Sequence, residues 1–221
     1  MMKVIELHAS ATASNDLDAA ALREELKDRG ILLINLMSSP GSGKTTLLSR
    51  LIRDFQGKLR IAVLEADIAS KVDAETIASL GAVSQQVHTD GMCHMDAGMT
   101  EEGLRHMDLD GIDVVFLENV GNLICPAEFD TGAHKNLMLL SIPEGDDKPL
   151  KYPLMFQKSD ALALTKTDAL PYFPFDIEKA TERAKHLNPD VSIFPVSAKT
   201  GDGMRDLEDW ILDSLRELRH A

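Results

Sequence analysis

The stretch from Ile31 to Leu48 constrains the fold of this chain more than any other. An apolar run, ILLINLM, is followed by the turn-forming loop SSPGSGKT and then by leucines at helical spacing. Strand, glycine-rich loop and helix in this order form a P-loop, in which backbone N–H groups and the positive end of the helix surround a phosphate. We therefore predict a mononucleotide site, with Ser38 in place of the usual first glycine.

The positions of this loop have distinct predicted roles. Lys44 is predicted to reach the β- and γ-phosphates as a catalytic residue, and the Thr45 hydroxyl to bind Mg²⁺. A chance glycine and serine turn is the alternative, but the flanking strand and helix disfavour it. The predicted nucleotide-binding residues here are Ser39, Pro40, Gly41, Ser42, Gly43, Lys44, Thr45 and Thr46.

The composition narrows the class of protein. The 221 residues suffice for one well-buried domain, and a formal charge of −13 argues against a nucleic-acid partner. No apolar run approaches the roughly 20 residues that span a bilayer. The amino-terminal residues lack the basic region and apolar core of a signal peptide. We expect a cytoplasmic protein with neither nucleic acid nor membrane as a partner.

Apolar runs and amphipathic segments alternate along the chain. This alternation predicts an α/β three-layer P-loop NTPase fold, a mostly parallel sheet with helices on both faces. We expect a single GTPase domain over 1–221, with 1–30 as an N-terminal helical extension. Predicted strands are 31–37, 59–66, 84–88, 112–117, 137–142, 161–164 and 191–196, predicted helices are 15–29, the helix after the P-loop, 72–80, 176–187 and 204–218, and 143–153 is a turn-rich connection.

Two carboxylates follow predicted strands at the P-loop edge of the sheet. Asp67 ends the strand 59–66, and Glu118 ends the strand 112–117. Ligands of open α/β sheets bind at the carboxyl ends of the strands. Both residues are therefore predicted to be catalytic and to contact Mg²⁺, and the Gly121 N–H to meet the γ-phosphate, so that 118–121 forms a switch. A helix cap is the alternative role for Asp67.

Two short elements later in the chain predict a guanine site. The sequence TKTD at 165–168 resembles the guanine-reading NKxD element, with Thr165 at the position of the asparagine. The Asp168 carboxylate has only acceptors and so pairs with the N1–H and 2-amino donors of guanine. Lys166 is predicted to pack its stem on the base. The role of the missing asparagine, which braces the loop, stays open.

The second element is SAK at 197–199, which resembles the last guanine-site element. Ser197 and Lys199 are predicted to contact the nucleotide, and the Ala198 N–H to donate to guanine O6. Each match alone also fits an ordinary loop. Both together, after a P-loop and at the ends of predicted strands, favour GTP and GDP as ligands.

The two cysteines of the chain, Cys93 and Cys125, suggest a metal site with His94. Thiolate and imidazole ligands suit both Zn²⁺ and Ni²⁺. Adjacent residues on a regular helix diverge by roughly 100°, so Cys93 and His94 require an irregular helix start, which the sequence DG at 90–91 would supply. The alternative from the residues alone is two free cysteines and a surface histidine.

Seven motifs in order, SSPGSGKTTLL, LEADIASKVDAETI, DGMCHMDAGM, FLENVGNLICP, EGDDKP, TKTD and SAKTG, resemble the HypB family. These are the nickel-insertion GTPases of hydrogenase maturation, in the SIMIBI branch of P-loop GTPases. The resemblance implies GTP hydrolysis coupled to nickel delivery to the hydrogenase large-subunit precursor, with a HypA-type accessory protein. It also implies that Cys93, His94 and Cys125 bind nickel or zinc and that GTP favours a homodimer.

Residues 1–30 depart from the pattern of many members, which carry a cysteine motif or histidine-rich tract there. This stretch has no cysteine and one histidine, His8, so we expect only the GTPase-domain metal site. Slow intrinsic hydrolysis is expected, because no glutamine follows Gly121 and no arginine finger can be singled out. Alternatives are a GTPase chaperone for another metallocofactor enzyme, of urease or cobalamin-mutase type, and a P-loop kinase, which the arginine-free loop 126–136 disfavours.

Overall fold

A computed structural model describes residues 7–66, 77, 79–89 and 91–220. Asp67 lies outside the described residues, so its predicted contact with Mg²⁺ stays a prediction. Asp90 and most of the predicted helix 72–80 also lie outside the described residues.

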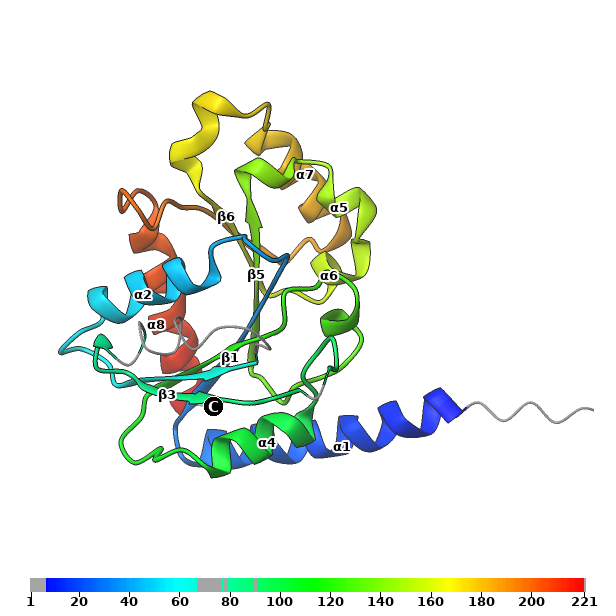
Figure 1. Cartoon of the computed structure of the whole chain (residues 1–221), viewed down its shortest axis with the longest axis vertical. Coiled ribbons are helices and arrows are strands. Elements are labelled where there is room, and N and C mark those ends of the chain that lie inside the picture. Colours follow the sequence, from blue (N-terminus) through cyan, green and yellow to red (C-terminus); the bar gives the residue numbers. More distant parts are fainter. Residues whose placement is uncertain (1–6, 67–76, 78, 90, 221) are drawn as a thin grey trace, which may run out of the picture.

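The strands of the described residues form one parallel sheet (Figure 1). Its seven strands follow the order β3-β2-β4-β1-β5-β6-β7, and every neighbouring pair is parallel. The strand containing the start of the P-loop motif is central. The strands are β1 (Leu32–Ser38), β2 (Ile61–Glu65), β3 (Val83–Gln86), β4 (Val114–Glu118), β5 (Lys135–Ser141), β6 (Ala161–Thr165) and β7 (Ser192–Pro195).

Helices cover both faces of this sheet, which confirms the predicted three-layer fold. On one face lie α2 (Lys44–Asp54) and α8 (Met204–His220), and on the other α1 (Leu7–Asp28), α4 (Ala97–Arg105), α6 (Pro153–Gln157) and α7 (Ile177–Leu187). The shorter helices are α5 (Lys148–Lys151), η1 (Cys125–Ala127), η2 (Ile142–Glu144) and η3 (Thr167–Tyr172).

Burial of β1 shows why this apolar run is a central strand. All seven of its residues are buried, as expected for a strand covered on both faces. Leu32, Ile34 and Leu36 pack with α2 and α8, whereas Leu33 and Met37 point to the opposite helices. Because side chains alternate between the faces, Asn35 also points into this opposite layer.

The connection 143–153 differs from its prediction as a series of turns, because η2 overlaps its start, α5 lies within it and α6 begins at its last residue. Prolines stand in the first turn of each of these helices, where the missing proline N–H has no intrahelical partner to lose. Glu144 also accepts from the backbone N–H of Ser141, which closes a capping box at the start of η2. Prolines taken as turn signals are thus helix starts.

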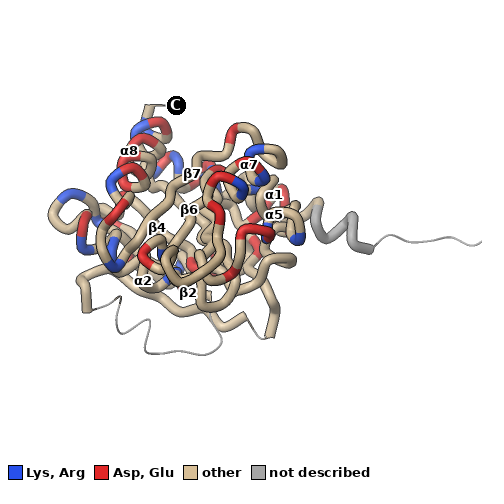
Figure 2. Tube along the Cα trace, turned by 90° about the horizontal axis from the view of Figure 1, so that it is seen from above, with Lys and Arg blue, Asp and Glu red and all other residues tan. Residues whose placement is uncertain are grey.

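The N-terminal helix is longer than its prediction, beginning at Leu7 instead of residue 15. It packs beside α4, where Leu22 and Leu26 join Leu104 in one apolar cluster. Among the described residues, no helix has the length and apolarity required to cross a membrane. Figure 2 shows acidic and basic residues interspersed along α8, where ion pairs such as Arg216 with Asp213 join neighbouring turns.

Candidate nucleotide and metal site

The P-loop turns sharply at two glycines. Gly41 and Gly43 have φ values of 74° and 100°, in the region that side chains with a Cβ avoid. Gly43 is also the N-cap of α2, so the loop opens onto the positive end of that helix. A pocket of about 480 Å³ lies here, lined by Pro40, Gly41, Gly43, Lys44, Thr45, Thr46, Glu118, Val120, Gly121 and Lys166.

Ser38 replaces the usual glycine without strain. It is the fully buried last residue of β1, and Lys166 is the only residue other than glycine with a positive φ in the described chain. The Ser38 hydroxyl donates to the Ser39 carbonyl at 2.8 Å and accepts from Lys44 Nζ at 2.9 Å. The serine therefore holds the Lys44 ammonium at the loop.

Thr45 and Glu118 meet in the pocket, because the Thr45 hydroxyl donates to Glu118 Oε1 at 3.3 Å. A hydroxyl and a buried carboxylate are hard oxygen ligands, and both fit Mg²⁺. When bound, Mg²⁺ would neutralise charge on the phosphates. The N–H of Ala66, the residue before Asp67, donates to the Glu118 carbonyl at 2.9 Å, so the end of β2 reaches the same place.

Gly121 lies directly against the P-loop. A Cβ at this position would stand 3.0 Å from the Pro40 nitrogen and 3.1 Å from its Cα, closer than side-chain carbons normally approach. The close contact, and not a positive φ, requires glycine here. The predicted switch 118–121 therefore touches the loop that is predicted to hold the phosphates.

The 165–168 loop also supports the P-loop. The Thr165 hydroxyl donates to the carbonyl of Ser42 at 2.7 Å, and Lys166 Nζ donates to the carbonyl of Gly41 at 2.7 Å. Thr165 thus braces the loop at the position where the NKxD element has asparagine. The sequence alone left this question open, since only the fold brings the β6 end beside Ser42.

The two guanine-site elements adjoin one another. Asp168 Oδ1 accepts from the Ser197 hydroxyl at 2.8 Å, and Asp168 Oδ2 lies 3.8 Å from the exposed Lys199 ammonium. The Ala198 carbonyl accepts from Arg50 at 3.4 Å, which ties the second element to α2. The structure brings these residues together as predicted, while the reading of guanine stays a prediction.

Cys93 and His94 lie in an irregular segment before α4. The helix itself begins at Ala97 and is capped by Asp96, so the expected irregular helix start is instead a loop. Cys93 Sγ lies 3.8 Å from His94 Nδ1. A hydrogen bond with the Cys125 thiol, followed by burial, raises the pKa of Cys93. The two cysteines, 32 residues apart in the sequence, are therefore neighbours.

The imidazole of His94 is buried and stacks on Phe129. The ring centroids are 3.9 Å apart with an interplanar angle of 12°. Burial lowers the pKa of His94, against the opposing influence of Asp96 and Glu128. Within 7–66, 77, 79–89 and 91–220, no three Cys, His, Asp or Glu side chains are arranged to hold a metal ion. The ligand set of Cys93, His94 and Cys125 stays a prediction.

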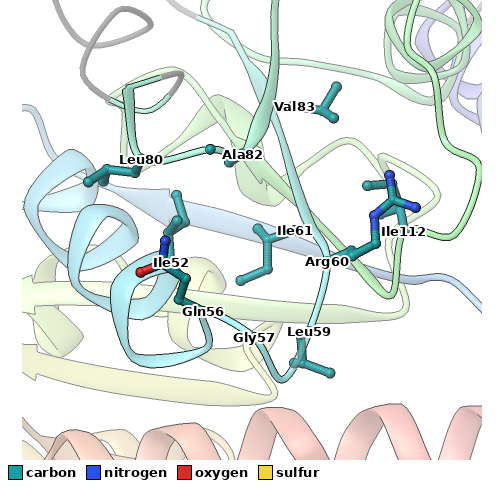
Figure 3. A pocket seen from close by; sticks show the side chains of 11 residues that line it. Ile52, Gln56, Gly57, Leu59, Arg60, Ile61, Leu80, Ala82, Val83 and Ile112 are labelled. Atoms are coloured by element: carbon teal, nitrogen blue, oxygen red, sulfur yellow. The ribbon is translucent and has the colours of Figure 1, made fainter.

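A second pocket, of about 200 Å³, lies at the opposite edge of the sheet (Figure 3). Ile52 and Leu80 line it together with Ile61 at the start of β2, and Arg60 stands beside it. This edge holds the amino ends of the strands, whereas open parallel sheets bind nucleotides at the carboxyl ends. The P-loop pocket is therefore the candidate nucleotide site.

The parallel sheet and its glycine-lysine loop define a P-loop nucleotide-binding protein. The family model described as "CobW/HypB/UreG, nucleotide-binding domain" matches residues 32–195. The chain therefore belongs to the CobW/HypB/UreG family and, within it, to the HypB hydrogenase maturation factors.

Individual relatives support this assignment over nearly the full chain. The hydrogenase maturation factor HypB of Azotobacter vinelandii is 39% identical over 231 residues, which cover 99% of this chain and 76% of that protein. The hydrogenase/urease maturation factor HypB of Helicobacter hepaticus is 42% identical, and the match covers 95% of this chain and 87% of that protein. The crystal structure of HypB from Helicobacter pylori in complex with nickel matches with a TM-score of 0.86 and 38% identity. The match covers 92% of this chain and 96% of that one.

Proposed function

We propose that this chain is a GTP-hydrolysing metallochaperone that binds nickel and supports its insertion into the hydrogenase large-subunit precursor. One observation carries the proposal: the segment that starts at the last residue of β4 connects the two sites. It begins at Glu118, which accepts from Thr45, touches Pro40 at Gly121 and reaches Cys125, the neighbour of Cys93. A change at the γ-phosphate would thus reach the metal ligands through a few residues of backbone.

The chemistry assigned to the nucleotide pocket is GTP hydrolysis. Lys44 would contact the β- and γ-phosphates, and Thr45, Glu118 and Asp67 would hold Mg²⁺. Asp168 would select guanine through its acceptor oxygens. Turnover would be slow, since the chain offers no identifiable arginine finger.

The chemistry assigned to Cys93, His94 and Cys125 is reversible binding of Ni²⁺ or Zn²⁺. Three ligands leave a coordination position for water, for a partner or for an acceptor protein, which suits transfer. The nickel-bound structure of the H. pylori relative supports nickel as the cargo. We propose a GTP-favoured homodimer in the cytoplasm, working with a HypA-type accessory protein.

The main alternative is the same chemistry with a different client enzyme. A relative from H. hepaticus is named a hydrogenase/urease maturation factor, which favours urease as a second client. Purified hydrogenase and urease precursors distinguish these clients in a nickel-transfer assay. Release of phosphate from GTP without any phosphorylated product would separate both from a kinase.

The decisive experiment is a titration of metal-free protein with Ni²⁺ and Zn²⁺, in GDP and in a non-hydrolysable GTP analogue. Cys93→Ala and Cys125→Ala should each weaken binding at least about tenfold, because each removes a thiolate ligand. Met92→Ala, a change at an exposed neighbouring residue, is the matched control. If the wild type binds neither metal in either nucleotide, the cysteines only pack and the metallochaperone proposal fails.

A further inference from the structure

Three asparagine side chains, two of them buried and the third half-buried, form a row across the centre of the sheet. Asn35 Nδ2 donates to Asn136 Oδ1 at 3.0 Å, and Asn119 Nδ2 donates to Asn35 Oδ1 at 3.1 Å. Asn35 and Asn119 are each only 1% exposed. The row crosses from β5 through β1 to the residue that follows β4, between two apolar clusters that include Leu33 and Met138.

Hydrogen bonds fix the orientation of Asn119 within this row. Its Oδ1 accepts from the backbone N–H of Met95 at 3.2 Å and from that of Val120 at 2.8 Å. A backbone N–H can only donate, so the amide oxygen faces Met95 and the amide nitrogen faces Asn35. The Asn119 N–H donates to the Leu36 carbonyl at 3.1 Å, which anchors the residue to the strand that leads into the P-loop.

This placement makes Asn119 the contact between two functional segments. In sequence it stands between Glu118, which accepts from Thr45, and Gly121, which packs on Pro40. Through its side chain it holds Met95, the residue directly after His94. A displacement of 118–121 that moves Asn119 Oδ1 must therefore either carry Met95 with it or break this hydrogen bond.

Burial of the Asn35 and Asn119 amides in an apolar layer has an energetic cost that hydrogen bonds only offset. Apolar side chains could fill the same layer without that cost. The amide row therefore stabilises the fold poorly for its size, but a network of this kind fixes the relative positions of its members. Because the row ends at the Met95 N–H, the segment whose position it fixes is the one that contains Cys93 and His94.

We propose that Asn119 is the positioning residue that links the nucleotide state of the switch 118–121 to the position of His94. This inference rests on the proposed function, since it concerns how GTP gates metal affinity. In one nucleotide state the bond from Met95 N–H to Asn119 Oδ1 holds the segment as observed. In the other, movement of the switch shifts that segment and alters the metal ligands.

The test compares Ni²⁺ affinity in GDP with that in a non-hydrolysable GTP analogue, as a ratio for each variant. The wild-type ratio should differ from one by about fivefold or more, as allosteric coupling usually does. In Asn119→Ala the ratio should fall to within about twofold of one, because differential binding requires the link. The affinity for GDP should change less than the ratio.

Two further variants separate positioning from simple loss of stability. Asn35→Ala removes a buried amide of the same row but leaves the Met95 to Asn119 bond, so it should lower the melting temperature while keeping the wild-type ratio. Asn119→Asp keeps the acceptor for Met95 N–H. Burial favours its neutral acid, whose O–H can replace the amide donor to Asn35 Oδ1, so this variant should keep the ratio too. If Asn119→Ala does not fold, Asn119→Ser takes its place, because its hydroxyl is too short to reach the Met95 N–H, and it should bring the ratio towards one in the same way.

The outcomes distinguish this inference from the proposed function. A wild type that binds no nickel overturns both, and a wild-type ratio of one overturns the gating together with the role of Asn119. A normal wild-type ratio that survives in Asn119→Ala leaves the metallochaperone intact and overturns the inference alone. Loss of the ratio in Asn119→Asp would likewise overturn the link through Met95.

Discussion

The P-loop pocket and the Cys93 region lie side by side along the chain's switch segment, yet they are built differently. The P-loop is braced by hydrogen bonds from Lys44, Thr165 and Lys166, so contacts within the chain hold its shape. Cys93, in a loop, lies near Cys125, at the start of η1, and the imidazole of His94 lies on Phe129. Hydrogen bonds within the chain thus already define the P-loop, whereas among the described residues the proposed metal ligands are brought near one another without a bracing network of that kind.

The largest expected effect is on nucleotide binding, when the Lys44 ammonium is removed from the P-loop. Lys44→Ala should weaken GDP binding about 100-fold, since a hydrogen bond to a charged group contributes up to ~3 kcal/mol. Fluorescence titration with a labelled GDP measures this. Lys158→Ala, outside the pocket lining, is the control.

The Ni²⁺ affinity of nucleotide-free Lys44→Ala should stay within about twofold of wild type, because separate sites have nearly additive effects. A parallel collapse of nickel binding would show that the two regions are one folding unit and would remove the contrast between them.

Changing the acceptor of Asp168 sharpens the nucleotide side. Asp168→Asn should shift the preference from GTP towards xanthosine triphosphate by about 10- to 100-fold, because xanthine has a carbonyl where guanine has its amino group. Competition between the two nucleotides measures the shift. Asp202→Asn, whose carboxylate accepts from Thr200, is the matched control. An unchanged GTP preference would mean that Asp168 does not read the base.

Removing the ring that stacks on His94 tests how this contact affects the proposed metal binding. Phe129→Leu should raise Ni²⁺ affinity about two- to tenfold, because ring stacking stabilises the observed position of His94 by ~0.5–1.5 kcal/mol. Isothermal titration measures it, with Phe173→Leu as the control at an exposed phenylalanine. A fall in affinity would show that Phe129 holds His94 ready for the metal.

The smallest expected effect is on the pH dependence of stability and comes from His134, the residue before β5. Its Nδ1 accepts from the Leu33 N–H at 3.0 Å and its Nε2 donates to the Arg23 carbonyl at 3.0 Å, so the imidazole is neutral and ties the loop to α1. Burial lowers the pKa of His134 below its ordinary value of 6.5.

The unfolded chain therefore binds the proton more readily, and stability falls as the pH drops below about 6.5 towards the lowered native value. His134→Gln keeps a donor and an acceptor but does not titrate. Its free energy of unfolding should depend less steeply on pH between about 7.5 and 5.5 than that of the wild type. Denaturant titrations at several pH values measure the slopes, and equal slopes would contradict the prediction.

Much of the fold follows from local patterns. All seven observed strands were predicted to within a few residues at each end. The apolar runs identified the central strands, because strands buried on both faces contain few polar positions, whereas the edge strands β3 and β7 are only half-buried. The P-loop was equally legible, because only glycine tolerates the backbone at 41 and 43. The helices of 143–153 were missed, because proline suits both turns and helix starts.

The contacts between segments distant in sequence were harder to predict. Thr165 was noted only as a departure from a motif, and its bond to the Ser42 carbonyl depends on the neighbouring positions of β6 and the P-loop. Phe129 carried no signal for its stack on His94. Asn35 did leave a trace, as one polar residue inside an apolar run, but its partners are about 100 residues away.

The sequence by itself therefore determined the sheet, the phosphate loop and the residue types available for guanine and metal binding, because these depend on periodicity, backbone freedom and side-chain chemistry. Only the tertiary structure decided which of these residues meet. It brought Cys93 beside Cys125, set His94 on Phe129 and bonded Asn119 to Met95, the residue after His94. The physical reason is that hydrogen bonds and packing act over a few ångströms, whichever residues the crossovers of the sheet bring together.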